Sequence, residues 1–539
     1  MKASETLFNT FLSQNKTQFV IPVYQRNYDW SVPQCSQLLN DILDVGRKKT
    51  DNHFIGSIVY IHDGIFTSAE VKPFVIIDGQ QRLTTISLLY LALLHHAERN
   101  GMDEKAEELQ QTFLQNKFVK NENSKLKLKQ AAANNSAFKH IIDGQNPDTF
   151  GEFSRIIENY RFFSAEINTT NFSEIIEGIN RLMFVEVALE RGKDDPQRIF
   201  ESLNSTGLDL SQADLIRNYI LMGLDPDQQE KVYNLQWSHI EIHARERGLQ
   251  ENRVSDFIRD FLTFKMKKIP AKGKVYEEFK KRFSARDAEF YNVLLPTLKE
   301  FAIYYDKLLN PDQETHELVR RELQNIKRLE IEVSYPFLLS VYSDYATKKI
   351  SVDQFLEVLR LVQSLAWRRF VVGLPTNALN QIFMNLYSEI DESNYVESIE
   401  YALARKKGTR RFPNDREIGE MFHDKDFYNI QKKNRDYFFS KLENHNTKEL
   451  IALPHAEMTI EHIFPQTPDA AWEAQLSESE LVLLKEKYLN TIGNLTLSGY
   501  NSSLSNKSFF EKKTMPDKGY NSSKLWLNDY LKNTDKWNV

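Results

Sequence analysis

The spacing of apolar residues divides the chain into three stretches, and the first of these mixes strand and helix signals up to about residue 224. Short apolar runs such as "HFIGSIVYIH" and "INRLMFVEVAL" predict buried strands. The run "PFVIIDGQQRLTTISLLYLALLHHAE" predicts a strand, a tight turn and a helix, and "PQCSQLLNDILDVGRK" has helical spacing. "KLKLK" alternates as an edge strand does, and Ser211 is a candidate N-cap for the helix that follows it.

The remaining two stretches differ from the first in their periodicity. Residues 225–401 show apolar positions at i, i+3 and i+4 almost throughout, which predicts an all-α connector. Residues 402–539 begin with a basic bridge, "RKKGTRRFPND", and continue with short apolar pieces that indicate a small α+β unit. We therefore expect an α+β multidomain protein that is mostly helical overall, with domains at 1–224, 225–401 and 402–539.

Composition and charge exclude several classes of protein but do not indicate a particular function. The chain has 539 residues, a net charge of −6 and a single cysteine, Cys35, so a disulfide within the chain and a cysteine-based zinc site are excluded. The sequence shows neither an apolar signal segment at the N-terminus nor a run of roughly 18 apolar residues. We expect a cytoplasmic protein that does not bind membranes. The negative net charge leaves nucleic acid open as a partner, because a local basic patch is sufficient.

The C-terminal stretch carries the first candidate chemistry, in "AEMTIEHIFPQTP". Hydrolysis of a phosphodiester needs a base for water, a divalent cation on the phosphate and a group that fixes the base's tautomer. Glu461 and His462 offer a carboxylate and a base on adjacent residues, and a turn at residues 463–465 can bring both to one pocket. Asn494 and Asn501 follow in "IGNLTL" and "YNSSLSN". The alternative is a buried histidine with a backbone partner and asparagines that cap turns.

These elements, in this order, resemble the HNH, or ββα-metal, nuclease motif. More closely, "IEHIFPQ", "YLNTIGNLTL" and "YNSSLSNKSFFEKK" resemble the C-terminal nuclease domain of the GmrSD family of modification-dependent, type IV restriction enzymes. The resemblance implies that His462 is the general base. It also implies that Asn494 braces the loop and orients the His462 side chain. It also implies that Glu461 and Asn501 bind a divalent metal, Mg²⁺ or Mn²⁺.

Basic residues near this motif are candidates for contacts with DNA backbone phosphates. A solvated linker is an equally good explanation of those in the bridge. The residues are Arg405, Lys406, Lys407, Arg410 and Arg411 in the bridge, and Lys507 and Lys513 after the motif.

The N-terminal stretch carries the second constellation, centred on "VIIDGQQRL" between a strand and a helix. A helix N-terminus behind a glycine favours anions, because its N–H groups are free and the helix dipole is positive there. Arginine can fork onto phosphate oxygens, and glutamines supply amide donors. The structural alternative is that the acid caps the helix and pairs with the arginine. The residues are Asp78, Gly79, Gln80, Gln81 and Arg82.

A second Gln-Arg pair precedes it in "YQRNYDW", with Gln25, Arg26, Tyr28 and Trp30. The aromatic residues of this segment are candidates to stack on a base, or else core residues. His53, Asn204 and Gly207 belong to two further candidate pieces, "HFIGSIV" and "IFESLNSTGLDLSQADLIRN".

Together these pieces resemble the GmrS-type N-terminal domain, which is related to the ParB/sulfiredoxin-like nucleotide-binding fold. The resemblance implies that residues 25, 26 and 78–82 bind a nucleoside triphosphate, with Asp78 as a metal ligand or water-orienting group. It also implies NTPase activity linked to DNA restriction.

The expected function is a nucleotide-regulated, metal-dependent DNA endonuclease that restricts modified phage DNA in bacterial antiviral defence. One alternative is an abortive-infection nuclease that acts on RNA or host DNA. Another is a ParB-like, nucleotide-gated DNA clamp with an inactive HNH domain. The sequence leaves open the DNA modification, the nucleotide and whether the chain forms a homo-oligomer.

Overall fold

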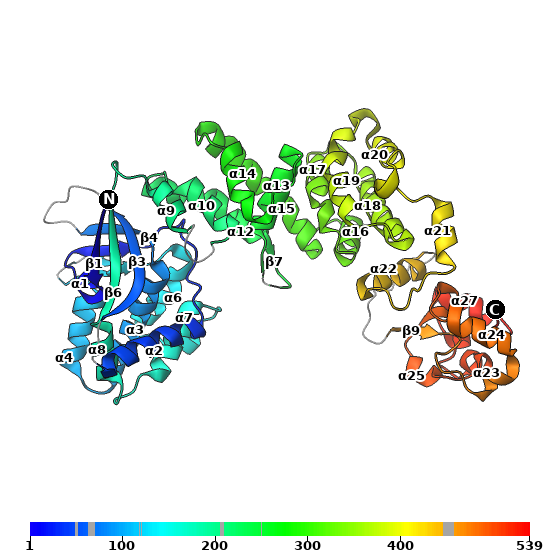
Figure 1. The fold of residues 1–539 in the computed structure, drawn as a ribbon, viewed down its shortest axis with the longest axis horizontal. Coiled ribbons are helices and arrows are strands. Elements are labelled where there is room, and N and C mark those ends of the chain that lie inside the picture. The colour runs from blue at the N-terminus through cyan, green and yellow to red at the C-terminus, as the bar shows by residue number, and fades with distance from the viewer. Residues whose placement is uncertain are drawn as a thin grey trace. The chain divides into compact units, whose positions relative to one another are not determined.

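The computed structural model describes residues 1–48, 52–62, 71–117, 119, 121–204, 210–249, 251–445 and 458–539 (Figure 1). The chain folds as two compact units. Met1–Ser238 and Phe279–Tyr291 form the first, and His239–Glu278 and Asn292–Val539 form the second. None of the helices in these described ranges is long and apolar enough to cross a bilayer.

The first unit is built on one mixed sheet. Among the described residues this sheet has six strands in the order β1-β6-β3-β4-β2-β5. β1 and β6 pair antiparallel, β3 and β6 pair parallel, and β3 and β4 pair antiparallel, while the short β5 lies at the edge. The strands are β1 (Lys2–Leu7), β2 (Thr17–Val20), β3 (His53–His62), β4 (Lys72–Asp78), β5 (Leu128–Lys129) and β6 (Leu182–Glu190).

A large apolar core holds most of the helices before residue 182 against the sheet, with the long helix α3 almost wholly buried within it. α3 packs on α7, and α2 packs on α8, beside the strands in Figure 1. The helices up to residue 238 are α1 (Phe8–Leu12), α2 (Val32–Lys48), α3 (Gln80–Arg99), α4 (Asp103–Leu109), α5 (Glu122–Lys125), α6 (Ala132–Ile142), α7 (Arg155–Glu166), α8 (Phe172–Ile179), α9 (Pro196–Asn204), α10 (Gln212–Leu221) and α11 (Pro226–Val232).

Most of the elements predicted for this unit are confirmed, although "KLKLK" forms a strand only at Leu128–Lys129, and the ParB/sulfiredoxin-like fold stays a prediction. The strands at β3, β4 and β6, the helices α2 and α3, and the edge position of β5 all follow the apolar periodicity. Ser211 caps α10 in a capping box with Asp214, because each side chain bonds the backbone N–H of the other residue.

Most of the second unit is helical, as the 3.6-residue periodicity predicts. A short hairpin interrupts the helices. Its strands, β7 (Arg245–Glu246) and β8 (Glu251–Asn252), have two residues each. The helices up to residue 445 are α12 (Ser238–His243), α13 (Val254–Met266), α14 (Val275–Arg282), α15 (Leu295–Leu309), α16 (Glu317–Arg328), α17 (Tyr335–Ala346), α18 (Val352–Val372), α19 (Asn377–Leu386), α20 (Tyr395–Ala404), α21 (Asp415–Phe422) and α22 (Lys432–Glu443). Helices α12 and α14 lie at the borders of the two units.

The C-terminal part of this unit contains the hairpin that carries the candidate nuclease residues. β9 (Thr459–His462) pairs antiparallel with β10 (Leu495–Ser498). The helices are α23 (Ala470–Gln475), α24 (Glu478–Leu483), α25 (Asn501–Leu504), α26 (Phe509–Thr514) and α27 (Asp529–Lys532). The expected α+β composition, mostly helical, is confirmed. The division into two units does not test the three predicted domains, so their boundaries at about residues 224 and 401 stay a prediction.

Candidate active site

His462 ends β9 and is almost fully buried, with its ring against Tyr428 at 4.4 Å between centroids. Its Nε2 lies 3.0 Å from Oδ1 of Asn490. The Asn490 amide nitrogen donates to Oδ2 of Asp426 at 3.2 Å. Because a carboxylate only accepts, this contact fixes the orientation of the amide and turns its oxygen toward His462. The imidazole therefore carries its proton on Nε2, and Nδ1 keeps a lone pair.

The electrostatics of this chain of groups favour a neutral imidazole. Burial lowers the pKa of His462 below its ordinary value, while the bond to Asn490 and the charge of Asp426 act the other way. Burial also raises the pKa of Asp426, but bonds from the Asn429 backbone and side chain and from the Tyr428 backbone outweigh it and leave that pKa lowered. Asp426 is thus an ionised anchor for Asn490, which in turn holds a neutral base.

Asn494, which ends the 3-10 turn just before β10, closes the loop after β9. Its Oδ1 accepts from the Phe464 backbone N–H at 2.7 Å, and its Nδ2 donates to the carbonyls of Phe464 and Leu489. Trp537 Nε1 also donates to the same Oδ1. Since the buried amide spends its hydrogen-bonding groups on the loop, Asn494 positions β9 and does not itself reach solvent.

Glu461 faces away from His462, because neighbouring residues of a strand point to opposite sides. Its Oε1 lies 2.6 Å from Nζ of Lys512, and Tyr520 approaches it at 3.4 Å. Lys512 is fully buried and also donates to the carbonyls of His462 and Ile463. Burial raises the pKa of Glu461 and lowers that of Lys512, and each partner's charge opposes the shift of the other.

The expectation that Glu461 and His462 share one pocket is therefore corrected. The turn after β9 does not bring the two side chains together. The ammonium group of Lys512 pairs with the carboxylate that was expected to bind metal. Asn501, at the start of α25, uses its Nδ2 on the Thr459 hydroxyl and the Ile460 carbonyl. No group of three His, Cys, Asp or Glu side chains converges on a cation position among the described residues.

Asn490, Asp426 and Tyr428 escaped the sequence analysis. Asn490 lies in "YLNTIGN", only four positions before the asparagine that the motif singled out, so its proximity was a usable signal. Asp426, in "HDKDFYN", gave none, because a contact with a residue 64 positions away leaves no local pattern.

The basic residues divide into paired and free groups. Arg405 and Lys406 both pair with Glu389, Arg411 pairs with Glu417, and Lys513 donates to the Thr534 carbonyl. Of the seven predicted phosphate contacts, Lys407, Arg410 and Lys507 are exposed and have no ion pair in the described ranges. Buried Arg369 of α18 fixes the bridge by donating to the carbonyls of Thr409 and Arg411. The bridge is therefore tied down on its backbone side.

In the first unit, the junction between β4 and α3 holds the second constellation. Gly79 caps α3 with φ of +91°, and a Cβ there would meet Ile58 at 2.9 Å. Arg82 donates to the Ile55 carbonyl at 2.7 Å and lies 3.7 Å from Asp78. Burial lowers the pKa of Arg82, and Asp78 opposes this.

Three glutamine amides fasten the segment around Arg26 onto this junction. Gln25 donates to the Ile77 carbonyl at 2.7 Å, and Gln80 donates to the Arg26 carbonyl at 2.8 Å. Gln81 accepts from the backbone N–H groups of residues 29 and 30 and donates to the carbonyl of residue 27. These amides shape the site and are already occupied, whereas the half-buried Arg26 side chain has no ion pair among the described residues.

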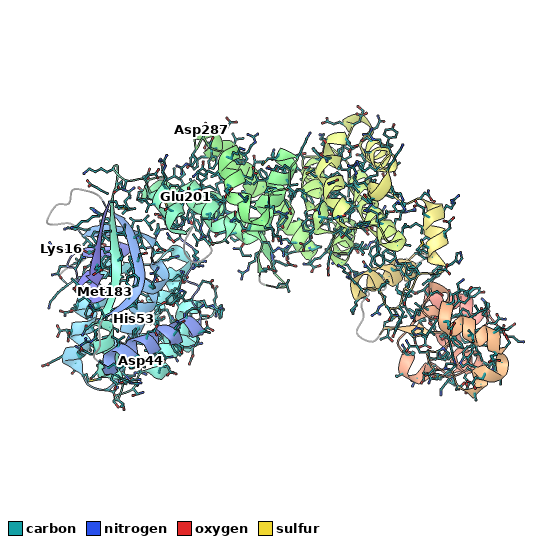
Figure 2. The ribbon with its side chains drawn as sticks, viewed as in Figure 1. Lys16, Asp44, His53, Met183, Glu201 and Asp287 are labelled. Atoms are coloured by element: carbon teal, nitrogen blue, oxygen red, sulfur yellow. The ribbon has the colours of Figure 1, made fainter. Side chains whose placement is uncertain are left out.

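The predicted aromatic contacts turn out differently. Tyr28 is buried, with its hydroxyl 2.7 Å from that of Thr85 and accepting from Asn159, so its ring is a core residue and not an open stacking face. Trp30 is partly buried against the same core. His53, labelled in Figure 2, begins β3 and lies 3.7 Å from the Asp41 carboxylate.

Two further predicted contacts, Asn204 and Gly207, lie at or beyond the end of α9. Gly207 lies outside the described residues, and Asn204 ends α9 with its side chain outside them.

Comparison with known families adds to this geometry. The model of the GmrSD restriction endonuclease N-terminal domain matches residues 8–221, and that of the GmrSD restriction endonuclease C-terminal domain matches residues 412–539. No curated protein matches the chain. The first match contains the β4–α3 junction, and the second contains the hairpin together with Asp426 and Asn490. The two matches cover more than half of the sequence, and the chain belongs to the GmrSD family of restriction endonucleases.

Proposed function

We propose that the chain is a nucleotide-regulated DNA endonuclease that cuts or nicks modified phage DNA in the bacterial cytoplasm as an antiviral defence. The observation that carries the catalytic part is the contact of the buried His462 Nε2 with Asn490, which is itself held by Asp426. In the reaction, Nδ1 accepts a proton from water while the water oxygen bonds to phosphorus. The bond from phosphorus to one sugar oxygen breaks, and that oxygen takes a proton from solvent.

A divalent ion, Mg²⁺ or Mn²⁺, is implied by the resemblance to HNH nucleases and would neutralise charge on the phosphate. The residues do not fit the predicted ligand set, because the Glu461 carboxylate is engaged by Lys512 on the side of β9 away from His462. We therefore derive no catalytic step through the ion. Dependence of cleavage on Mg²⁺ or Mn²⁺ remains a prediction, tested by chelation and add-back.

Nucleotide binding is proposed at the β4–α3 junction. The N–H groups at the start of α3 favour a phosphate, and Arg26 supplies a cation that no ion pair in the described ranges consumes. Hydrolysis of the triphosphate, with Asp78 orienting the water, is the finer proposal. An Arg26→Ala variant is expected to lose binding of a fluorescent ATP or GTP analogue, whereas Arg198→Ala, an exposed arginine of the same unit, is expected to keep it.

DNA is the proposed partner, with Lys407, Arg410 and Lys507 contacting backbone phosphates. Their exposure and their freedom from ion pairs in the described part of the chain support these contacts.

The deciding experiment compares cleavage of matched modified and unmodified phage genomes. Purified protein is incubated with Mg²⁺ or Mn²⁺, with and without each nucleoside triphosphate. Cleavage of the modified genome that disappears in His462→Ala supports the proposal. Intact DNA under every condition would refute it, and cleavage of RNA or host DNA alone would favour the abortive-infection alternative.

A further inference from the structure

A cavity of about 420 Å³ opens beside the end of the hairpin opposite His462. Its wall runs from Ser498 through Tyr500 and then across residues 517–525. Ligand sites in proteins commonly measure about 300–1,000 Å³, so the space suits a small organic unit and not merely a few waters. The candidate active site does not use this cavity.

The floor of the cavity is fixed before any ligand arrives. Asn528 accepts from Thr496 Oγ1 at 2.6 Å and donates to the Leu497 carbonyl and to Ser523. Ser498 accepts from the Tyr500 backbone N–H at 2.9 Å. Because these polar groups are satisfied internally, they hold the shape of the cavity and leave recognition to the side chains around its mouth.

Those side chains combine three kinds of chemistry. The Tyr500 side chain is 48% exposed and offers an aromatic face. Lys518 and Lys524 bring ammonium groups, of which Lys518 contacts only the Ser503 hydroxyl, at 3.4 Å, and neither pairs with a carboxylate in the described residues. Asp517 adds a carboxylate without an ion pair in the same ranges. An aromatic face stacks on bases, ammonium groups bind phosphates, and a carboxylate accepts from an exocyclic amine such as cytosine N4.

The position of the cavity relative to His462 is set by the hairpin register. Ser498 pairs with Thr459, and Leu495 pairs with His462. At about 3.4 Å per residue, the two ends of the hairpin lie roughly 10 Å apart. That length equals about three nucleotide steps of one DNA strand at about 3.4 Å each. The separation along the hairpin is thus within the reach of one strand, although the floor residue Ser498 pairs with Thr459 on the Glu461 face of the hairpin, opposite to His462.

We propose that this cavity binds one unstacked nucleotide of the DNA substrate. Tyr500 stacks on the base, Asp517 accepts from its exocyclic amine, and Lys518 and Lys524 contact the flanking phosphates. The assignment rests on the proposed function, since it takes the substrate to be DNA.

The test measures binding, separately from cleavage. Full-length protein with His462→Ala is titrated into fluorescein-labelled oligo-dC and oligo-dT, and fluorescence anisotropy gives the dissociation constants. The nucleotide proposal expects oligo-dC to bind more tightly than oligo-dT, because thymine has no exocyclic amine.

Variants at the cavity are added to this background. Tyr500→Ala is expected to weaken binding of both oligonucleotides about tenfold, as loss of one stacked base does. Asp517→Ala is expected to remove the preference for oligo-dC. Lys524→Ala is expected to lower the salt slope of log K by about 0.7, the value for one phosphate of a single strand. Tyr401→Ala and Lys485→Ala, exposed residues outside the cavity wall, serve as controls and are expected to bind within twofold of the parent.

The outcomes separate the two proposals. If the wild-type chain cleaves DNA but the cavity variants bind oligonucleotides as the His462→Ala parent does, the cavity assignment is wrong and the nuclease proposal stands. If the cavity variants lose binding while wild-type protein never cleaves, the nuclease proposal is wrong and the cavity assignment stands. Failure of the parent to bind any DNA overturns both.

Discussion

Replacing Lys512 by methionine should destabilise the C-terminal hairpin strongly. The ammonium group is fully buried and donates to the Glu461 carboxylate and to two backbone carbonyls, those of His462 and Ile463. Methionine keeps most of the volume but leaves the carboxylate buried without its counter-ion. Removing one partner of a buried pair costs about 3–5 kcal/mol of unfolding free energy.

Hydrogen exchange of the full-length protein, read on peptides that cover β9 and α26, measures this loss locally. The free-energy change corresponds to roughly 150- to 4,000-fold faster exchange at protected amides, at about 1.4 kcal/mol for each factor of ten. Lys513→Met is the matched control. Lys513 donates to the Thr534 carbonyl and lies 3.8 Å from the exposed Asp535, so its loss should cost only about 1 kcal/mol.

A double variant separates the ion pair from general damage to packing. Glu461→Gln removes the stranded charge, so combining it with Lys512→Met should recover part of the loss. Exchange in Lys512→Met no faster than in Lys513→Met, or a double variant worse than Lys512→Met alone, would show that the pair does not stabilise the hairpin.

Three further predictions follow from the described contacts. Asn490→Ala should slow DNA cleavage about 10- to 100-fold while oligonucleotide binding stays unchanged, because it frees the imidazole of His462 to rotate. Single-turnover kinetics measures the rate, and an unchanged rate would contradict the role of Asn490 in orienting His462. Burial lowers the pKa of His462, and only the neutral ring accepts a proton. The cleavage rate should therefore rise with pH through a pKa below about 6.5 and be level above it. A pH–rate profile with its midpoint above that value would contradict the assignment of His462 as the general base. Gly56→Ala should destabilise the first unit by about 1–3 kcal/mol in thermal unfolding, because its φ is +97° and a Cβ would lie 2.1 Å from the Arg82 guanidinium; Gly101→Ala, with φ of +68° and open space around it, isolates the backbone cost and should lose less.

The spacing of apolar residues predicts most of the helices and strands, because the features that build them are local in sequence. A buried strand, a positive-φ glycine and a buried helix each leave a local signature, and the stretch that begins "VIIDGQQRL" contains all three. Gln80 and Gln81 show the limit of such reasoning. Their amides looked available for a ligand, yet they bond the backbone of residues 26–30, more than 50 positions earlier.

The candidate active site shows the same division. The order of motifs led to His462 and Asn494 because both lie on one hairpin and its loop. The partner of Glu461 could not be predicted, because Lys512 lies 51 positions later and any buried cation would satisfy the same carboxylate. Alternation along β9 is the local signal that separates Glu461 from His462, because the turn after the strand does not overcome it.

The contact with Asp426 determines how much of the chain is needed to keep the His462 side chain anchored. The imidazole is oriented by residues from three places in the chain: Asp426 before α22, Asn490 ahead of β10, and the strand that bears the histidine. A fragment that starts at β9 would carry every residue of the motif and still lose the anchor of its base. Grafting this nuclease onto another protein, or exchanging it between relatives, therefore needs the segment from about residue 412 onward, and a relative that lacks an acid at the position of residue 426 should carry a different anchor for its histidine.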